Sequence, residues 1–136
     1  MNAPSKDIIQ ILEEIGESSG FADLIYATNL FKNREPAIPI NCVTIFDTSG
    51  FSPDLGLSTQ GYERPSIQVR VRNKKQTDAQ ELIERIKDAL HGLAQTTVNG
   101  TLYSVIYAVG SPALLDWDDN GNCRFICNFN IQRRSV

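Results

Sequence analysis

The chain has 136 residues, of which 41% are hydrophobic and 21% charged, with a formal net charge of −3 and a pI near 5.1. This length suits a single domain over residues 1–136 with its own core. The net negative charge excludes an overall positive potential that would attract nucleic acid. No apolar run approaches the roughly 18 residues that are needed to cross a bilayer. The first seven residues lack the apolar core of a signal peptide, so we expect a cytoplasmic protein with no membrane partner.

Apolar residues at helical spacing predict a first helix from Ser5 to about Ile15, with Ser5 as its cap and Gly16 as its end. The next segment, Phe21–Phe31, carries apolar residues without a clean period. It is either a short strand or a collar that packs on the sheet.

Two prolines, Pro36 and Pro39, break any regular element before the strand Ile40–Asp47, which is rich in β-branched residues. A loop then runs from Phe51 to Arg64 and is too long and too apolar for a mere connector. Loops of this kind in compact domains tend to be functional, although a flap folded onto its own domain is an equal alternative.

The segment Arg64–Arg72 alternates apolar and polar side chains with period two, which indicates a strand with one buried and one basic face. The period then changes to that of an amphipathic helix that ends near Gly92. Thr77 and Gln80 are spaced as a capping box at its start. Because such a helix must bury its stripe, we expect it to lie on a sheet.

After the helix, the sequence predicts a turn over Gln95–Gly100 and a strand over Leu102–Val109. A polar hairpin turn, Asp116–Asn122, then leads into a last strand over Cys123–Gln132. The predicted order is therefore α-β-β-α-β-β. It indicates the α+β class, with one mixed or antiparallel sheet of about four strands packed against two helices.

No catalytic motif or phosphate-binding loop occurs in the sequence, so we expect neither an enzyme nor a cofactor. The three cysteines, Cys42, Cys123 and Cys127, are expected to be free buried thiols. With His91 they lack the spacing of a zinc site. A small cytoplasmic enzyme that uses a cysteine thiolate with His91 is the alternative from another class.

The run Asp116-x-Asp118-x-Asn120-Gly121 begins like a calcium-binding loop. Its twelfth position is Cys127 instead of the glutamate that would bind the ion. The run is therefore expected to be a solvated hairpin tip, and no metal site is predicted.

Basic residues cluster at the end of the Arg64–Arg72 strand and at the end of the chain, at Arg133–Arg134. The polar face of this strand is solvated, pairs with acidic groups across a subunit boundary, or faces phosphate. A nucleic-acid-binding module is a further alternative, which the acidic net charge disfavours.

The chain carries four features in order: Asn29-Leu30-Phe31 followed by Pro36 and Pro39, the strand Val43–Gly50, the segment Tyr62–Arg72, and the helix ending Asp88–Leu93. Together they resemble the small minor capsid and tail-completion proteins of long-tailed bacteriophages, above all the tail terminators. The resemblance covers most of the chain, from about Asn29 to Arg133, and rests on strand and helix spacing.

The resemblance implies a structural virion protein that forms a hexameric ring on the last ring of the tail tube, ends tube polymerisation and provides a head–tail joining surface. Its implied partners are copies of itself, the tail tube protein and a head-completion or connector protein, with DNA only as passing cargo. It implies a place in the virion tail or neck, and in the host cytoplasm during assembly. A related neck or head-completion protein is the alternative within this class.

Under this resemblance the long loop and the adjoining strand form the expected contact with a neighbouring subunit or the tube. The residues expected at this contact are Phe51, Leu55, Leu57, Tyr62, Arg64, Gln68, Arg70 and Arg72. Lys74 and Lys75 are expected to face the lumen or phosphate.

Overall fold

The computed structural model describes residues 1–19, 24–53 and 61–136. These form two helices and seven strands: α1 (Pro4–Ser19), β1 (Leu30–Lys32), β2 (Cys42–Phe51), β3 (Arg64–Asn73), α2 (Gln76–Leu90), β4 (Leu93–Val98), β5 (Thr101–Ala108), β6 (Ala113–Trp117) and β7 (Cys123–Ser135).

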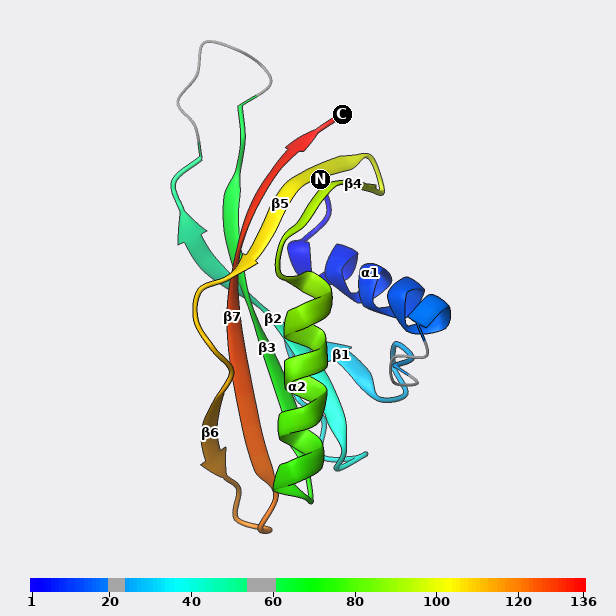
Figure 1. Ribbon diagram of the computed structural model, residues 1–136, viewed down its shortest axis with the longest axis vertical. Helices are drawn as coiled ribbons and strands as arrows, with labels where there is room; N and C mark the ends of the chain where they lie inside the picture. The colour runs from blue at the N-terminus through cyan, green and yellow to red at the C-terminus, as the bar shows by residue number, and fades with distance from the viewer. Residues whose placement is uncertain (20–23, 54–60) are drawn as a thin grey trace.

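The strands make one mixed sheet in the order β1-β2-β3-β7-β5-β4, and β6 pairs with β7 beside that path. Only β1 and β2 run parallel among the described pairs. Along one edge, β7 pairs first with β6 and further on with β5, so these two strands share that edge of β7 (Figure 1). Helix α1 contacts β1–β3, α2 contacts β3, β5 and β7, and the two helices contact each other over the same face.

The α+β class is confirmed, but the predicted sheet of about four strands and the order α-β-β-α-β-β are wrong. The predicted turn Gln95–Gly100 is mostly strand β4, because its threonines suit a strand and the chain reverses only at Asn99 and Gly100. These two residues have φ of 50° and 77°, as a two-residue hairpin turn requires. In Phe21–Phe31 the short-strand alternative holds for Leu30 and Phe31, the start of β1.

The predicted boundaries of α1 are wrong at both ends: Ser5 lies inside the helix, which begins at Pro4 and continues past Gly16 to Ser19. The cap comes from a distant strand. Asp47 on β2 accepts hydrogen bonds from the Ser5 backbone nitrogen at 2.9 Å and from Ser5 Oγ at 2.7 Å. A carboxylate at a helix N-terminus satisfies unpaired N–H groups and complements the helix dipole.

The predicted capping box of α2 is also wrong, because the helix begins at Gln76 and its N-cap, Lys75, makes no side-chain cap hydrogen bond. Asn73 sets this earlier start: its Oδ1 accepts from the Lys75 backbone nitrogen at 3.0 Å, which turns the chain directly out of β3. The predicted end is confirmed, since α2 stops at Leu90 and Gly92 follows with φ of 84°.

The apolar face of β3 is buried under the helices, as the period-two pattern predicts. One row of paired residues crosses the whole sheet at this level: Leu30, Val43, Val71, Phe125 and Leu114. It runs from β1 at one lateral edge to β6 at the other. Within the described residues, neither helix is long and apolar enough to span a membrane.

Candidate functional site

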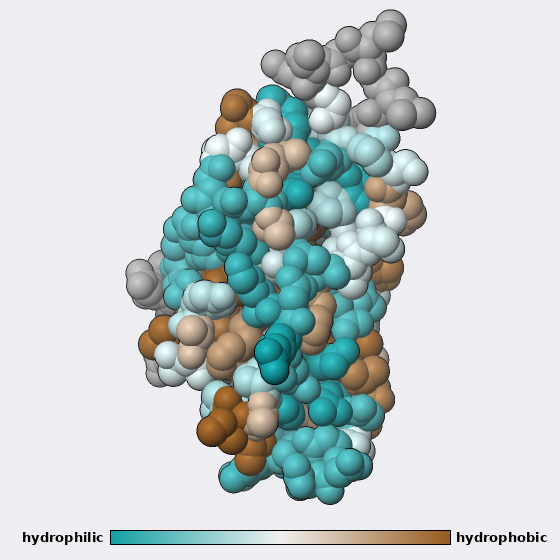
Figure 2. All heavy atoms as spheres, turned by 180° about the vertical axis from the view of Figure 1, so that it is seen from behind, coloured by the Kyte–Doolittle hydropathy of each residue, from teal (hydrophilic) through white to brown (hydrophobic). Residues whose placement is uncertain are grey.

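The face of the sheet turned away from the helices carries a ladder of polar side chains along β3 and β7. Ser66 Oγ donates to Asn130 Oδ1 at 2.6 Å, and Gln68 Nε2 donates to Asn128 Oδ1 at 3.2 Å. Seen from behind, this face is largely hydrophilic, with hydrophobic atoms toward its lateral margins (Figure 2). Gln68, one of the predicted interface residues, therefore belongs to a surface whose polar groups bond within the chain.

Arg70 lies on the same face, half-buried. Its guanidinium lies over the Phe46 ring, 4.7 Å from the centroid, and donates to Gln68 Oε1 at 3.1 Å. The side chain is thus held by its own sheet, and its predicted contact with a subunit or the tube remains untested.

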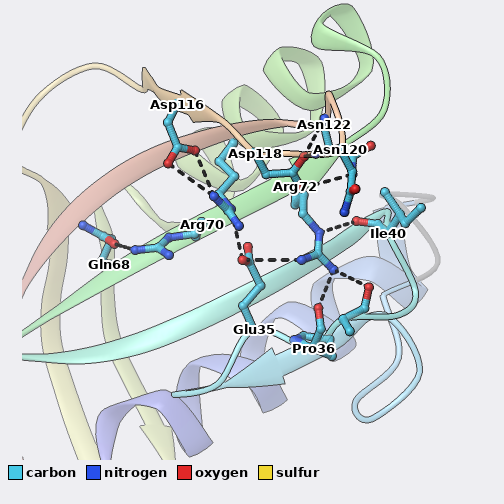
Figure 3. Close-up of polar contacts among 12 residues, drawn as sticks. Glu35, Pro36, Ile40, Gln68, Arg70, Arg72, Asp116, Asp118, Asn120 and Asn122 are labelled. Carbon is cyan, nitrogen blue, oxygen red and sulfur yellow. Dashed lines mark hydrogen bonds and ion pairs between the residues drawn. The ribbon is translucent and has the colours of Figure 1, made fainter.

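Arg72 is 6% exposed, because the segment between β1 and β2 crosses over it. Its Nε donates to the carbonyl of Ile40 at 2.9 Å, and its Nη2 donates to those of Pro36 at 2.5 Å and Pro39 at 3.0 Å (Figure 3). Arginine suits this position because its fixed fork of donors reaches several acceptors at once. Arg72 therefore stabilises a loop within the chain, a role that sequence reasoning missed.

Glu35 lies between two arginines of neighbouring strands. One of its oxygens is 3.5 Å from Arg72 Nη1 and 3.0 Å from Arg124 Nε, and Arg124 also pairs with Asp116 of β6 at 3.1 Å (Figure 3). The network joins the crossing segment to β3, β7 and β6. No local sequence signal marks Glu35, because its partners lie 37 and 89 positions further along the chain.

Lys74 and Lys75 form the exposed turn from β3 into α2, where the Lys74 backbone nitrogen donates to Asn41 Oδ1 at 3.1 Å. Because Asn73 pairs with Cys123, this turn lies beside the β6–β7 hairpin. The basic turn and the acidic hairpin tip thus share one end of the molecule.

The calcium-like run forms a hairpin tip, as the sequence predicts. Asp118 Oδ1 accepts from the backbone nitrogens of Asn122 at 2.8 Å and Asn120 at 2.9 Å. These hydrogen bonds, the one from Asn122 first, lower the pKa of Asp118. Among residues 1–19, 24–53 and 61–136, no group of acidic, histidine or cysteine side chains is arranged to hold a metal ion.

Strand β2 ends and β3 begins at the opposite end of the molecule, so the described residues on either side of the predicted contact loop lie there (Figure 1). Phe51 at the end of β2 is 64% exposed, while Leu55 and Leu57 lie outside the described residues. At Gly50 φ is 68°, and an added Cβ would lie 2.4 Å from the Arg64 carbonyl oxygen. Only glycine fits this close approach, which accompanies a shift of register in the β2–β3 pairing.

Tyr62 and Arg64 lie at the return of this hairpin, half-buried. Between them, Glu63 exchanges backbone hydrogen bonds with Arg133 at 2.8 and 3.0 Å and pairs with its guanidinium at 3.2 Å. The return strand is therefore attached to β7.

An exposed apolar strand, β6, was missed in the sequence because it follows Gly110-Ser111-Pro112 and has only five residues. All five are exposed, and Leu114, Leu115 and Trp117 expose 44%, 42% and 50% of their surface. The available sequence signal is the apolar pair Leu114-Leu115 before Asp116. This pair belongs to no helical or alternating pattern.

A second polar network, centred on buried Asp7 and Tyr103, joins α1 to strand β5. Tyr103 Oη donates to Asp7 Oδ2 at 2.5 Å, Asn99 Nδ2 donates to Asp7 Oδ1 at 2.9 Å, and Arg133 Nη1 donates to Tyr103 Oη at 3.3 Å. Burial, and then the hydrogen bond to Asp7, raises the pKa of Tyr103 well above its usual value.

This shift predicts a loss of stability at alkaline pH. Above pH 10 the unfolded chain releases the Tyr103 proton while the folded chain keeps it, so the free energy of unfolding falls by up to about 1.4 kcal/mol per pH unit from this group. Urea titrations between pH 9 and 12 should show a shallower decline for Tyr103→Phe than for wild type. Tyr107→Phe is the control on the same strand; equal slopes for Tyr103→Phe and wild type would contradict the prediction.

The cysteines are free and buried, as predicted. Burial raises the pKa of all three thiols, and that of Cys127 to about 11, so they are protonated near neutral pH. His91 Nδ1 already accepts a hydrogen bond from the Ala108 backbone nitrogen at 2.9 Å. A thiolate nucleophile therefore finds no support in this geometry.

Comparison with known proteins gives two findings. The family described as "Bacteriophage tail terminator protein" matches residues 10–134. Among solved structures, a chain of the "Virion of native gene transfer agent (GTA) particle" is similar, with a TM-score of 0.66, 13% sequence identity, and coverage of 98% of this chain and 96% of that one. At this identity the likeness shows a shared fold. No curated protein matches the sequence.

Proposed function

The chain belongs to the bacteriophage tail terminator family, and from this premise we propose that it closes the growing tail tube as a ring of identical copies and offers a joining surface to the head. The family match over residues 10–134 is the observation that carries this proposal, since it spans nearly the whole chain. It makes the protein a structural component of a phage tail. We propose that residues 1–136 act as one domain in that assembly.

The chemistry of the described residues supports a structural role. The cysteine thiols are buried and protonated, and the polar clusters around Arg72 and Tyr103 bond within the chain. What the surface offers instead is exposed apolar side chains at a hairpin end and along a sheet edge, at Phe51 and on β6. Exposed apolar groups of this kind mark contacts with other proteins.

We place the contact with the tube or a neighbouring subunit at the β2–β3 hairpin, which includes Phe51, Tyr62 and Arg64. Leu55 and Leu57 share this role, and Gln68 and Arg70 on the strand face remain candidates. Arg72 is buried at the other end of β3, under the segment between β1 and β2. Lys74 and Lys75 would face the lumen. The acidic side chains at the β6–β7 hairpin tip beside them would weaken their binding to the phosphates of passing DNA.

Negative-stain images of the purified protein, alone and mixed with tail tubes, test the proposal. We expect rings or capped tube ends, and tubes that stop growing when the protein is added during polymerisation. Phe51→Asp should reduce capping at least about tenfold, because a charge replaces an apolar anchor at the contact. Glu81→Lys, an exposed change on α2 away from this hairpin, should cap normally. Tubes that grow past the added protein, with no rings in solution, would overturn the proposal.

A further inference from the structure

The exposed side of β6 combines apolar side chains with a sheet edge that pairs with nothing in the described chain. Leu114, Leu115 and Trp117 are each at least 42% exposed, and the strand is bound to the sheet only through β7. Proteins rarely leave an apolar edge strand uncovered, because it invites association. The β4 edge differs, since it carries no exposed large hydrophobic side chain.

The opposite lateral edge of the sheet is hollow. A depression of about 610 Å³ beside β1 is lined by Tyr26, Phe31, Lys32, Arg34 and Pro36 among others. A second one, of about 220 Å³, lies between β1 and α1 and shares Tyr26 and Lys32 with the first. We call the two together the β1-edge trough.

The two edges lie at the same level of the sheet. Leu30 of β1 and Leu114 of β6 are the two ends of the row of paired residues that crosses β2, β3 and β7. A rotation about an axis roughly parallel to the strands therefore brings β6 of one copy beside the β1-edge trough of the next. Repeating this head-to-tail contact closes a ring when the rotation divides the circle evenly.

The two edges expose charges of opposite sign. The β6–β7 hairpin carries Asp116, Asp118 and Asp119, of which Asp116 is already paired with Arg124. The β1-edge trough carries Lys6, Lys32 and Arg34 together with Glu13 and Glu35, and Glu35 is already paired with Arg72 and Arg124. The Lys32 ammonium lies over the Tyr26 ring, 5.8 Å from its centroid. Within the part of the chain that the structure describes, neither Lys32 nor Arg34 makes an ion pair. Complementary charges of this kind fix register and partner at an interface.

We propose that β6 and the adjoining hairpin tip of one copy dock into the β1-edge trough of the next copy, with Trp117 as the apolar anchor and Asp119 opposite Arg34. The inference rests on the proposed ring and names its subunit contact. The contact is made by side chains more than by strand addition, because the backbone N–H and C=O of Leu30 are already bonded to Ile25 and Ala27.

Trp117 is the only tryptophan in the chain, so its fluorescence reports this contact directly. Sedimentation and emission spectra are measured together over a concentration series. We expect the emission to shift to the blue as oligomers form. Asp119→Lys and Arg34→Glu should each weaken association at least about tenfold, and the double variant should restore it, because every contact then carries the reversed pair. Glu81→Lys, an exposed charge reversal on α2, is the control.

A disulfide cross-link tests the same contact even when the protein assembles only on tail tubes. The variant Leu115→Cys with Tyr26→Cys should give a ladder of covalent oligomers on oxidation, in free rings or on capped tubes, whereas each single variant should not. Rings or capped tubes that form without a ladder and with unchanged affinity of the charge variants would overturn this contact and leave the ring standing. If no oligomer forms alone or on tubes, the proposed function itself fails.

Discussion

Replacing Arg72 by methionine is expected to lower the free energy of unfolding by about 3–5 kcal/mol. The guanidinium is buried and holds the carbonyls of Pro36, Pro39 and Ile40. Without it these acceptors lose their donors, and Glu35 keeps a buried charge with one arginine fewer. The apolar stem of methionine fills the space, so the loss reflects charge and hydrogen bonding.

Urea denaturation at neutral pH measures this effect, and for a chain of this length the melting temperature should fall by roughly 10–20 °C. Arg70→Met is the matched control on the same face, and its cost should stay near about 1 kcal/mol because Arg70 holds only Gln68 and the Phe46 ring. Hydrogen exchange should speed up first in residues 33–41. Equal losses for the two variants would show that the crossing segment does not depend on Arg72.

Asp7→Ala is expected to cost about 3 kcal/mol, because it removes the acceptor for two side chains at once. Tyr103 Oη and Asn99 Nδ2 both donate to this carboxylate, which is fully buried. Tyr103 is also fully buried, so its hydroxyl would keep only the contact with Arg133. The change also removes an acidic group from the first turn of α1, where it complements the helix dipole.

Thermal unfolding of Asp7→Ala beside Glu14→Ala measures this cost. Glu14 is exposed on the same helix and accepts only from Gln10, so its removal should change stability by less than about 0.5 kcal/mol. Asp7→Asn keeps one carbonyl acceptor and should fall between the two. If Asp7→Ala were as stable as Glu14→Ala, the network between α1 and β5 would contribute nothing measurable.

The parts of the fold with a regular hydrophobic period could be predicted from the sequence. Alternation in Arg64–Arg72 and Cys123–Gln132 gave β3 and β7, and the helical stripe before Gly92 gave α2, since burial of one face leaves a direct mark on residue spacing. Short edge strands such as β1 and β6 leave no such mark. They form because a neighbouring strand presents free N–H and C=O groups.

The candidate site was less accessible to sequence reasoning for the same reason. Arg72 sits in a pattern that reads as a solvated face, and only the crossing segment after β1 buries it. The partners of Asp47 and Glu35 lie far along the chain, at separations that no local pattern encodes. The apolar edge at Trp117 was visible as composition, but its exposure depends on which strand ends the sheet.

The long antiparallel pairing of β3 with β7 has a mechanical consequence. Strands β3 and β7 pair along most of their length, with the start of β3 at one end of the molecule and the β6–β7 hairpin at the other. Their hydrogen bonds lie perpendicular to the strands, so tension between the two tips would load the whole ladder in shear instead of opening it bond by bond. A subunit built in this way resists stretching along the axis that joins its two hairpins.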